Sequence, residues 1–270
     1  MVSKRVIFTL LFDSGFFMLS RNFRLQRVGD LAWLTKNYDF ARTASQIDEL
    51  VVINVERNPT DQVSFTDHLR ELCNFCFVPI TAGGGIRSAD DASRLLSNGA
   101  DKVLINTMAV RDEPQLLRIV ERYGRQSVVL GIDVRRYEAE RRALTNYGEI
   151  VVQRDIRRHF DDLRRLPVGE WMITSIDRDG TGQGFEVELL DLLPEGFDKP
   201  VILSGGASKP EHFVSTFSDP RVSALSTAHL FNFVGDGLEK VRTALLHAGN
   251  DLPRWHADEI LQLRGVVLES

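Results

Sequence analysis

Two glycine-rich segments of the sequence have the composition of anion-binding loops. They are ITAGGGI, residues 80 to 86, and ILSGGAS, residues 202 to 208, and an apolar run leads into each. Glycine at a strand end lets backbone N–H groups approach an anion closely, and a following helix N-terminus adds a favourable dipole. Two such loops, with Asn106 and Thr107 after a further apolar run, predict a substrate that carries two phosphates. The alternative is that the glycines only serve tight turns between strands and helices.

Aspartates at the ends of two other apolar runs could transfer protons. Asp133 ends the run SVVLGID, and Asp177 and Asp179 follow the run that begins EWMITS. A carboxylate at a strand end can act as an acid or a base, or orient a substrate hydroxyl. The segment DRDGTGQG is a poor calcium loop, because it lacks the bidentate acidic residue of that motif. Turn formation remains the alternative for Asp177 and Asp179.

The elements that must position these residues follow a regular pattern. Apolar runs of strand length alternate with amphipathic segments such as DDASRLLSNGA, which is typical of a parallel sheet covered by helices. The runs occupy residues 5–12, 49–55, 78–84, 102–107, 127–133, 170–177, 200–206 and 222–228. Eight of them predict an α/β fold of the (β/α)8 barrel type.

The glycine segments also indicate an internal repeat. They end the third and the seventh run, so the chain resembles two similar half-barrels, and the same offset sets Asp133 against Leu11. No Pro-rich or Ser-rich linker divides the chain, so we expect residues 1–270 to form one domain, with 236–270 as a C-terminal helix and tail of unclear role. Segments 20–32 and 135–155 are predicted to be long polar loops over the active-site face.

Four charged residues stand at the opposite ends of the runs. Charged groups just inside the lower mouth of a barrel must pair with one another or remain hydrated. The sequence leaves two interpretations of these four residues open, a purely structural ring of salt bridges and a gate for a small molecule. The four residues are Arg5, Glu49, Lys102 and Glu170.

Composition excludes several classes of partner. The formal charge of -5 provides no global positive field for nucleic acid or an anionic membrane, so any phosphate must be bound locally. The segment KRVIFTLLFD has basic residues followed by an apolar run, as a signal peptide does. Its apolar run is short, however, Asp13 ends it, and no small-residue cleavage site follows. No apolar run approaches the length of a membrane span. We therefore expect a cytoplasmic protein whose first strand includes this segment.

The two cysteines form a C-x-x-C pair, Cys73 and Cys76. Such a pair can be a redox site or half of a zinc site. The sequence has no second cysteine pair, and the segment reads as the end of a helix that leads into an apolar strand. We expect no metal and no cofactor.

The motifs together resemble one family. KRVI, IDELVVINV, ITAGGGI, GADKVLINT, VVLGIDVRR, TSIDRDGTGQG and ILSGGA follow, in this order, the pattern of the HisF family, the cyclase subunit of imidazole glycerol phosphate synthase in histidine biosynthesis. The resemblance implies a HisH-like glutaminase at the N-terminal face of the barrel. It also implies that ammonia passes through a charged gate and along the core. At the other end it would react with a phosphorylated small molecule, a ribulosyl-aminoimidazole bisphosphate.

The resemblance also assigns roles to individual residues. It identifies the four charged residues as the gate, and it implies that Asp101 beside them promotes glutaminase activity. At the last pair of phosphate-binding positions this sequence has Thr-Ala where the family has Ala-Ser, which keeps the backbone donors and loses a hydroxyl. The positions that it implies for phosphate and substrate binding are Gly85, Asn106, Thr107, Thr174, Asp179, Gly180, Ser204, Gly206, Thr227 and Ala228.

The departures from the family gather around the first strand. The family uses two aspartates as acid and base, and the second is retained as Asp133, whereas Leu11 occupies the position of the first. Leu19 replaces a loop lysine and Asn54 replaces an aspartate. Leucine cannot transfer a proton, and loss of one member of an acid/base pair costs a factor of about 100 or more. Asp13 is a candidate substitute, about 6 to 7 Å farther along the strand.

Three hypotheses follow from this pattern. The favoured one is a HisF-like paralogue that receives ammonia from a glutaminase and delivers it to a different acceptor, as in amidination of a surface-polysaccharide sugar. The second is a true cyclase that uses Asp13 and Asp133. The third is a catalytically silent barrel that activates its partner glutaminase.

Overall fold

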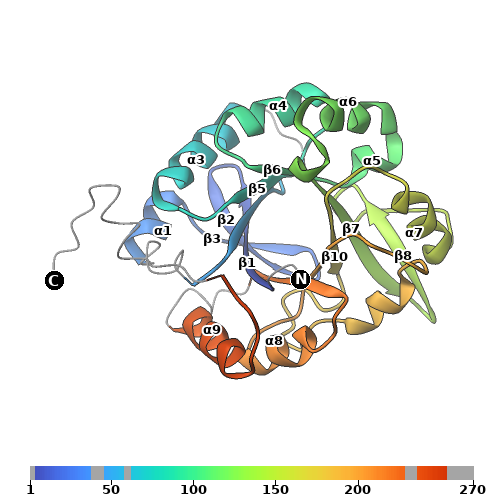
Figure 1. The fold of residues 1–270 in the computed structure, drawn as a ribbon. Coiled ribbons are helices and arrows are strands. Elements are labelled where there is room, and N and C mark those ends of the chain that lie inside the picture. Colours follow the sequence, from blue (N-terminus) through green and yellow to red (C-terminus); the bar gives the residue numbers. More distant parts are fainter. Residues whose placement is uncertain (1–3, 38–45, 58–61, 229–235, 254–270) are drawn as a thin grey trace.

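Eight parallel strands close into a barrel at the centre of the molecule (Figure 1). The computed structural model describes residues 4–37, 46–57, 62–228 and 236–253. Each strand pairs with the next, and the last pairs with the first. Each overlaps the apolar run predicted for it, so the predicted (β/α)8 barrel is confirmed. The strands are β1 (Arg5–Asp13), β4 (Glu49–Asn54), β5 (Ile80–Gly83), β6 (Lys102–Ile105), β7 (Val128–Tyr137), β10 (Glu170–Ser175), β11 (Val201–Ser204) and β12 (Val222–Thr227).

Helices surround the barrel as an outer layer (Figure 1). Ser88 begins α4 with a capping box, in which its hydroxyl accepts from the Asp91 N–H while the Asp91 carboxylate accepts from the Ser88 N–H. None of the described helices is long and apolar enough to cross a membrane. The helices are α1 (Leu31–Asn37), α3 (Gln62–Phe75), α4 (Ala89–Ser97), α5 (Thr107–Arg111), α6 (Glu113–Tyr123), α7 (Ile156–Arg164), α8 (Pro210–Phe217) and α9 (Gly237–His247), with 3-10 turns η1 (Arg125–Ser127) and η2 (Val187–Leu192).

The barrel strands bury apolar side chains on both faces. Outward-facing residues such as Phe8 and Trp171 pack against the helices in a large outer core. Inward-facing residues alternate with them and form a smaller inner core. Because both faces are buried, the strands are nearly continuous apolar runs, which is why the sequence reveals them so clearly.

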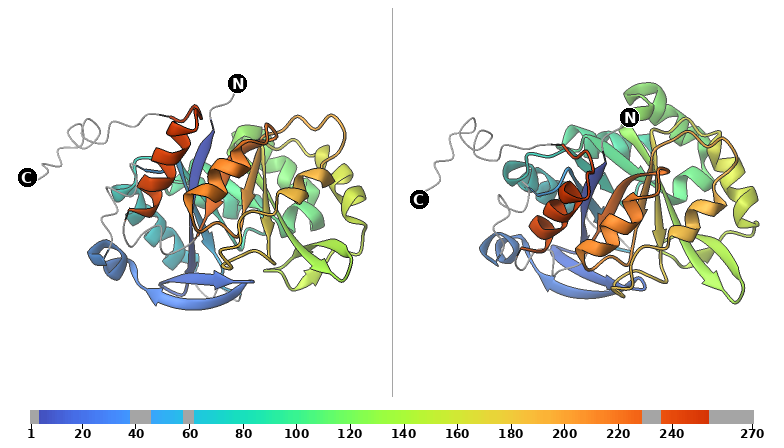
Figure 2. Two further views of the ribbon diagram at one scale, coloured as in Figure 1. Left: turned by 90° about the horizontal axis from the view of Figure 1, so that it is seen from below. Right: turned by 60° about the horizontal axis from the view of Figure 1, so that its bottom comes forward.

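Two β-hairpins extend the barrel where long polar loops were predicted. Segment 20–32 contains most of the hairpin β2 (Phe16–Arg21) and β3 (Arg24–Gly29), and segment 135–155 contains β8 (Glu140–Thr145) and β9 (Ile150–Val151), paired with an extended β7. The prediction of loops was therefore wrong. Both hairpins lie at the end of the barrel opposite the N-terminus (Figure 2).

The turns of these hairpins explain why the hairpins were not predicted from the sequence. Asn22 and Phe23 both have positive φ, 53° and 63°, and so do Asn146 and Tyr147, 53° and 59°. Such turns usually contain Asn-Gly or Asp-Gly, and an aromatic residue in the second position is not a hairpin signal. The exposed strands also carry arginines in place of a clear apolar alternation.

The remaining predictions fall partly on described residues. Cys73 and Cys76 are not joined in a disulfide, and each Sγ lies near a backbone carbonyl, Gly99 O at 3.5 Å and Val78 O at 3.8 Å respectively. Helix α9 packs beside α8, whereas residues 254–270 of the predicted tail lie outside the described residues.

Candidate functional site

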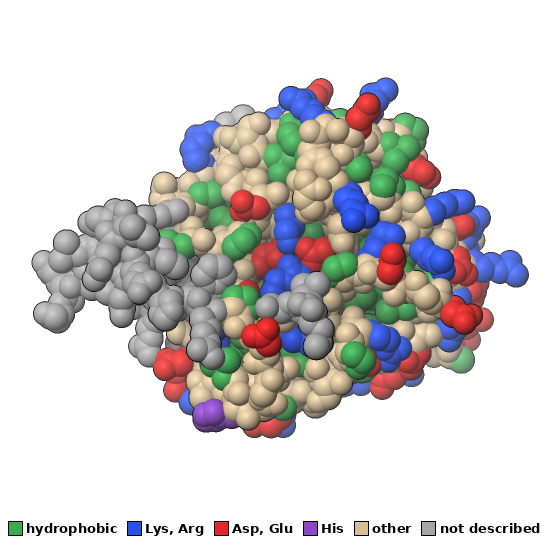
Figure 3. All heavy atoms as spheres, viewed as in Figure 1, with side chains coloured by type: hydrophobic (Ala, Val, Ile, Leu, Met, Phe, Trp, Pro, Cys, Tyr) green, Lys and Arg blue, Asp and Glu red, His purple; other side chains and the backbone are tan. Residues whose placement is uncertain are grey.

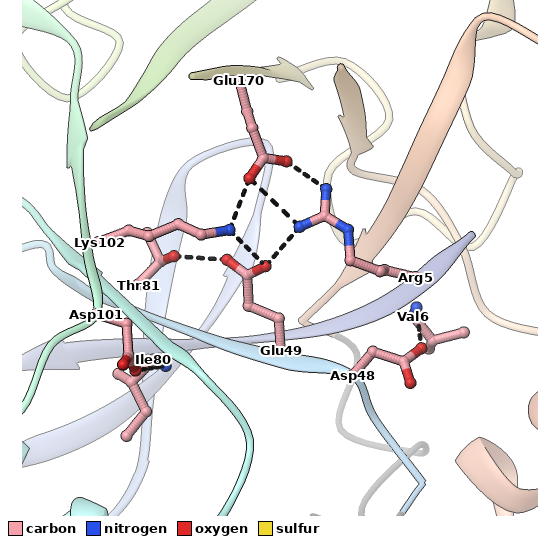
Figure 4. A network of polar contacts seen from close by, with 9 residues as sticks. All are labelled: Arg5, Val6, Asp48, Glu49, Ile80, Thr81, Asp101, Lys102 and Glu170. Carbon is pink, nitrogen blue, oxygen red and sulfur yellow. Dashed lines mark hydrogen bonds and ion pairs between the residues drawn. The ribbon is translucent and has the colours of Figure 1, made fainter. Parts of the chain in front are cut away.

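The four charged residues at the N-terminal end of the barrel meet in a closed ring (Figure 4). Glu49 Oε2 lies 2.8 Å from Arg5 Nη1 and 3.1 Å from Lys102 Nζ. On the other side, Glu170 pairs with Arg5 Nη2 and lies 2.6 Å from Lys102 Nζ. Positive and negative charges therefore alternate around the ring, and both signs are visible at the centre of this face (Figure 3). The sequence predicted these four residues as a set, and the structure brings them together.

The ring is shielded from solvent and each charge is compensated by its neighbours. Glu49 is 2% exposed, and its other oxygen accepts from the Thr81 hydroxyl at 2.5 Å. Burial opposes the ionisation of Glu170, but hydrogen bonds and charges from Arg5 and Lys102 outweigh it and hold the pKa of Glu170 below its ordinary value. Burial likewise opposes the charge of Arg5, and the two glutamates raise its pKa despite that. Arg5 and Glu170 thus keep their charges at neutral pH.

Two aspartates fasten the strands beside the ring in the same way. The N–H of Asp48 donates to Val6 O and the N–H of Asp101 donates to Ile80 O, each at 2.8 Å. In return, a carboxylate oxygen of each aspartate accepts the N–H of the same partner residue, again at 2.8 Å. Asp48 is buried and pairs with Arg242 at 3.0 Å, whereas Asp101 is exposed. Asp101 therefore has a structural contact and a carboxylate that remains accessible at this face.

Apolar side chains fill the barrel between the ring and the far end. Ile53 and Leu104 are partly buried and pack against this inner cluster. One polar pair crosses the upper part, where the hydroxyls of Thr9 and Ser226 lie 2.6 Å apart. The inner core consists of uncharged, apolar residues. They are Ile7, Val51, Val129, Met172, Ile202 and Ala224.

Asp133 is the central acidic group at the C-terminal end of the barrel. It lies on β7, and its carboxylate accepts a hydrogen bond of 2.8 Å from Asn106 Nδ2. Burial, and next the negative charge of Asp179, raise the pKa of Asp133 to about 7, while the bond from Asn106 opposes this change. A carboxyl with this pKa can both accept and donate a proton near neutral pH.

Polar residues continue from Asp133 across the neighbouring strands. Asp133 pairs in register with Thr174, Thr174 with Ser204, and Ser204 with Ser226. Residues in register share a face of the sheet, so these four form a polar row along the inside of the mouth. Thr227 lies on the opposite face of β12 and is buried, whereas Ala228 just after the strand is half-buried.

The row across β1 is apolar instead. Leu11 pairs in register with Met18 on one side and with Ile53 on the other, and all three are only partly buried. Asp13 is the last residue of β1, on the same face as Leu11, and its carboxylate accepts from the Ser14 hydroxyl at 2.8 Å. The mouth of the barrel therefore has a polar side that carries Asp133 and an apolar side that carries Leu11.

Asp179 contacts the hairpin β2–β3. One carboxylate oxygen accepts from the Ser20 hydroxyl at 2.5 Å and from the Phe23 N–H at 3.1 Å. Burial raises the pKa of Asp179, and these two hydrogen bonds oppose the rise. The neighbouring glycine is also required here, because a Cβ on Gly180 would lie 2.2 Å from Ser20 O.

Asp177 points elsewhere and joins the two hairpins. Its carboxylate accepts the N–H of Arg136, in the extended part of β7, at 2.7 Å. Its backbone carbonyl accepts from Asn22 Nδ2, in the turn of β2–β3, at 2.9 Å. Of the two aspartates that the sequence singled out in this segment, Asp179 interacts with Asp133 and Asp177 holds the hairpins.

The two glycine loops have backbone conformations that only glycine adopts easily. Gly84, Gly85, Gly205 and Gly206 all have positive φ, between 67° and 101°. A Cβ on Gly84 would lie 1.9 Å from Asn54 O, whereas a Cβ on Gly85 would meet nothing closer than the Tyr147 hydroxyl at 3.8 Å. Gly84 thus serves packing, and Gly85 faces open space. The Thr107 hydroxyl beside this loop accepts the N–H of Asn146 at 2.9 Å.

The sequence missed a buried carboxylate near this end. Glu186 accepts from the Ser175 hydroxyl at 2.5 Å and forms an ion pair of 2.8 Å with Arg141 of β8. It thereby ties the second hairpin to the segment after β10. Its partner lies far away in the sequence and no motif connects them, although a glutamate between Phe185 and Val187 was a sign of burial with a partner.

Comparisons with known proteins agree along nearly the whole chain. A family model described as histidine biosynthesis protein matches residues 24–233. A protein of Parasynechococcus marenigrum, provisionally named imidazole glycerol phosphate synthase subunit hisF2, is 44% identical over 256 residues, which cover 94% of this chain and 95% of the relative. Imidazole glycerol phosphate synthase subunit HisF of Saccharolobus solfataricus is 34% identical over 243 residues, 90% and 94% of the two chains. HisF of Staphylococcus carnosus is 34% identical over 260 residues, 95% and 100%.

Proposed function

This chain belongs to the HisF family of histidine biosynthesis proteins, and on that premise we propose that it is the barrel subunit of a glutamine-dependent amidotransferase. A HisH-like glutaminase binds the N-terminal face and releases ammonia at the ring of Arg5, Glu49, Lys102 and Glu170. The ammonia crosses the barrel and reacts beside Asp133. The acceptor is a phosphorylated small molecule or sugar other than the cyclase substrate of the family, and a surface-polysaccharide sugar that undergoes amidination is one such acceptor.

The observation that carries this proposal is the contrast between the two ends of the barrel. The charged ring at the lower end is complete, whereas Leu11 stands in an apolar row at the position of the family's first acid. This contrast supports a barrel that admits ammonia at its lower end and retains, as Asp133, one acid of the pair that cyclisation uses in the family.

The apolar interior suits ammonia in its neutral form. A charged ammonium ion would lose its hydration among Ile7, Val51 and Met172, at a cost that neutral ammonia avoids. The ring must open to admit it, and the single ammonium group of Lys102 bonds to both glutamates, so its movement would break two ion pairs together. The Thr9 and Ser226 hydroxyls give a polar contact near the exit.

Asp133 suffices for the proton transfers of ammonia addition. When ammonia attacks an electrophilic carbon, the new N–C bond leaves a positively charged nitrogen that must lose a proton, and the leaving group must gain one. A carboxylate with a pKa of about 7 can take the first proton and then donate it. The phosphate of the acceptor is held at the glycine loops, at Gly85, Gly206 and the neighbouring positions that the family resemblance assigns.

A glutaminase assay tests the proposed partner. Glutamate formation by a purified HisH-like glutaminase is measured with and without the chain, and we expect the chain to stimulate it at least about tenfold. Asp101→Asn keeps an oxygen that can accept the Ile80 N–H, so it tests the exposed charge, whereas Asp101→Ala removes both. We expect both variants to reduce the stimulation. No stimulation by the wild-type chain would refute the amidotransferase role.

A second candidate is an authentic imidazole glycerol phosphate synthase cyclase. It is favoured by the names of the relatives, which match nearly the whole chain, and by Asp13, which lies on the same face of β1 as Leu11. In this alternative Asp13 takes the role of the missing acid together with Asp133. Turnover of the bisphosphorylated family substrate with ammonium distinguishes the two candidates. Glutaminase stimulation without turnover of any acceptor would instead indicate a silent, activating barrel.

A further inference from the structure

The hairpin β2–β3 is basic in an acidic chain. Residues 16–29 contain Arg21, Arg24 and Arg27 and no aspartate or glutamate, although the chain as a whole has a formal charge of -5. Arg27 stacks over the ring of Phe16, with its Cζ 3.8 Å from the ring centroid. The other two arginines stack on no aromatic ring among the described residues.

Arg21 and Arg24 are directly opposite each other in the hairpin. Both are exposed, and no residue in the described part of the chain forms an ion pair or hydrogen bond with either guanidinium. Like charges directly opposite in an antiparallel pair are destabilising. The pair therefore gains from any anion that binds between the two side chains.

Contacts place this pair at the rim of the mouth. The hairpin is held to the segment after β10 by bonds from Ser20 and Phe23 to Asp179. A Cβ on Gly180 would lie 3.1 Å from Arg21 Cβ, and a Cβ on Gly205 would lie 3.5 Å from Asp179 N. Only the segment around Asp179 and Gly180 thus separates the arginine pair from the glycine loop of Gly205 and Gly206.

Strand alternation shows which side of the hairpin the pair occupies. Arg21 is on the opposite face from Ser20, which bonds to Asp179. The pair therefore lies on the side of the hairpin that faces away from Asp179. A group bound there belongs to the outer end of the acceptor rather than to its reacting centre.

We propose that Arg21 and Arg24 form an outer anion subsite, which binds a further phosphate of the acceptor beyond the one held at the glycine loop of Gly205 and Gly206. This inference rests on the proposed function, since it concerns the same acceptor. Two guanidinium groups offer forked donors that match the oxygens of a phosphate, and such charge-assisted bonds are the strongest that exposed side chains form. A phosphate between them also cancels their mutual repulsion.

The surroundings favour a small molecule over a polyanion. Asp177 and Asp179, which contact the same hairpin, are acidic, and the net charge of the chain is negative. A nucleic acid would require an extended basic surface to replace its counterions. Two unpaired arginines beside a glycine loop instead fit a compact group such as a diphosphate, with one phosphate at each subsite.

Calorimetric titration with inorganic pyrophosphate, and separately with orthophosphate, tests this proposal. A double variant of the hairpin carries Arg21→Gln and Arg24→Gln. A control double variant carries Arg118→Gln and Arg125→Gln, and it loses the same charge at exposed positions on α6 and η1. We expect the hairpin variant to bind pyrophosphate about tenfold or more weakly than the wild type, and the control to change by less than about twofold. Orthophosphate should lose less, because it can stay at the glycine loop.

Three results would overturn the proposal: equal pyrophosphate affinity in the hairpin variant, an equal loss in both double variants, or no pyrophosphate binding by the wild type. If the double variant does not fold, Arg24→Gln alone is titrated. The titration needs no glutaminase, so its result is independent of the partner assay. Failure of glutaminase stimulation with an intact pyrophosphate response would refute the proposed function and leave the subsite standing.

Discussion

The two ends of this barrel handle charge in opposite ways. At the N-terminal end four charged groups compensate one another in a closed ring, and the charged forms of Arg5 and Glu170 gain more from their neighbours than they lose by burial. At the C-terminal end burial and a second carboxylate act together on Asp133, and its pKa rises to about 7. The same fold thus stabilises charge at one end and makes it titratable at the other, and only the second arrangement suits proton transfer.

The largest effect should come from opening the ring. Glu49→Ala removes the carboxylate that binds both Arg5 and Lys102 and leaves two partly buried cations with one partner. Breaking a buried ion pair in this way costs about 3 kcal/mol or more of the free energy of unfolding. Urea denaturation at pH 7 measures it.

Glu49→Gln is the matched control, because it keeps the shape and the bond from Thr81 while removing the charge. We expect its cost to be smaller than that of Glu49→Ala. A loss below about 1 kcal/mol for Glu49→Ala would contradict the view that the ring depends on mutual compensation.

The next effect concerns Asp133, where we expect a substitution to raise the stability of the protein rather than lower it. Its pKa is raised from 3.8 to about 7, so between these values the native state holds a proton that the unfolded chain releases. The stabilisation from this group is present at low pH and is lost as the pH rises through 7. Asp133→Asn keeps the neutral state, so it should be more stable than the wild type at pH 8, by about 2 to 4 kcal/mol, and nearly equal to it close to pH 4.

Urea denaturation at pH 4 and pH 8 tests this prediction. Asp161→Asn, an exposed aspartate on α7, is the control and should change stability by less than about 0.5 kcal/mol at either pH. If Asp133→Asn were the less stable protein at pH 8, the account of Asp133 as a group that loses stability on ionisation would be wrong.

The smallest effect should be local to the first hairpin. Ser20→Ala removes the hydroxyl that bonds to Asp179, at a cost of about 1 kcal/mol. Because the bond joins the hairpin to the barrel, the amide of Phe23 should exchange its hydrogen about fivefold faster, with little change in global unfolding. Ser215→Ala, whose hydroxyl bonds only within α8, serves as the comparison. Unchanged exchange at Phe23 would show that the hairpin does not depend on this contact.

The ring and the barrel could be predicted because both follow from the strands. Strands buried on two faces are apolar throughout, so a charged residue at the start of such a strand, as with Glu49 or Lys102, is conspicuous and its position in the barrel is fixed by the strand count. The raised pKa of Asp133 could not be read in the same way, because it depends on burial and on Asp179, which come together only in the fold.

The hairpins were less predictable for a different reason. Their turns place Phe23 and Tyr147 in a left-handed conformation that local sequence preferences do not favour, and tertiary contacts hold them there. The Phe23 N–H donates to Asp179, and the Phe23 ring packs beside Gly148, where a Cβ would lie 2.7 Å from its Cδ2. Likewise, Asp177 joins the two hairpins whereas Asp179 acts on Asp133, and two aspartates with one residue between them give no sign of that division.

The measurement that tests the central claim most directly is a steady-state assay with the bisphosphorylated ribulosyl-aminoimidazole substrate and excess ammonium at pH above 8. Substrate loss is followed for the folded wild-type chain and for Asp133→Asn. The account predicts no detectable turnover by the wild type, because Leu11 and its neighbours Met18 and Ile53 leave one acid where the cyclase reaction uses two. Robust turnover that Asp133→Asn abolishes would contradict it and would assign the role of the missing acid to another group, with Asp13 as the first to examine.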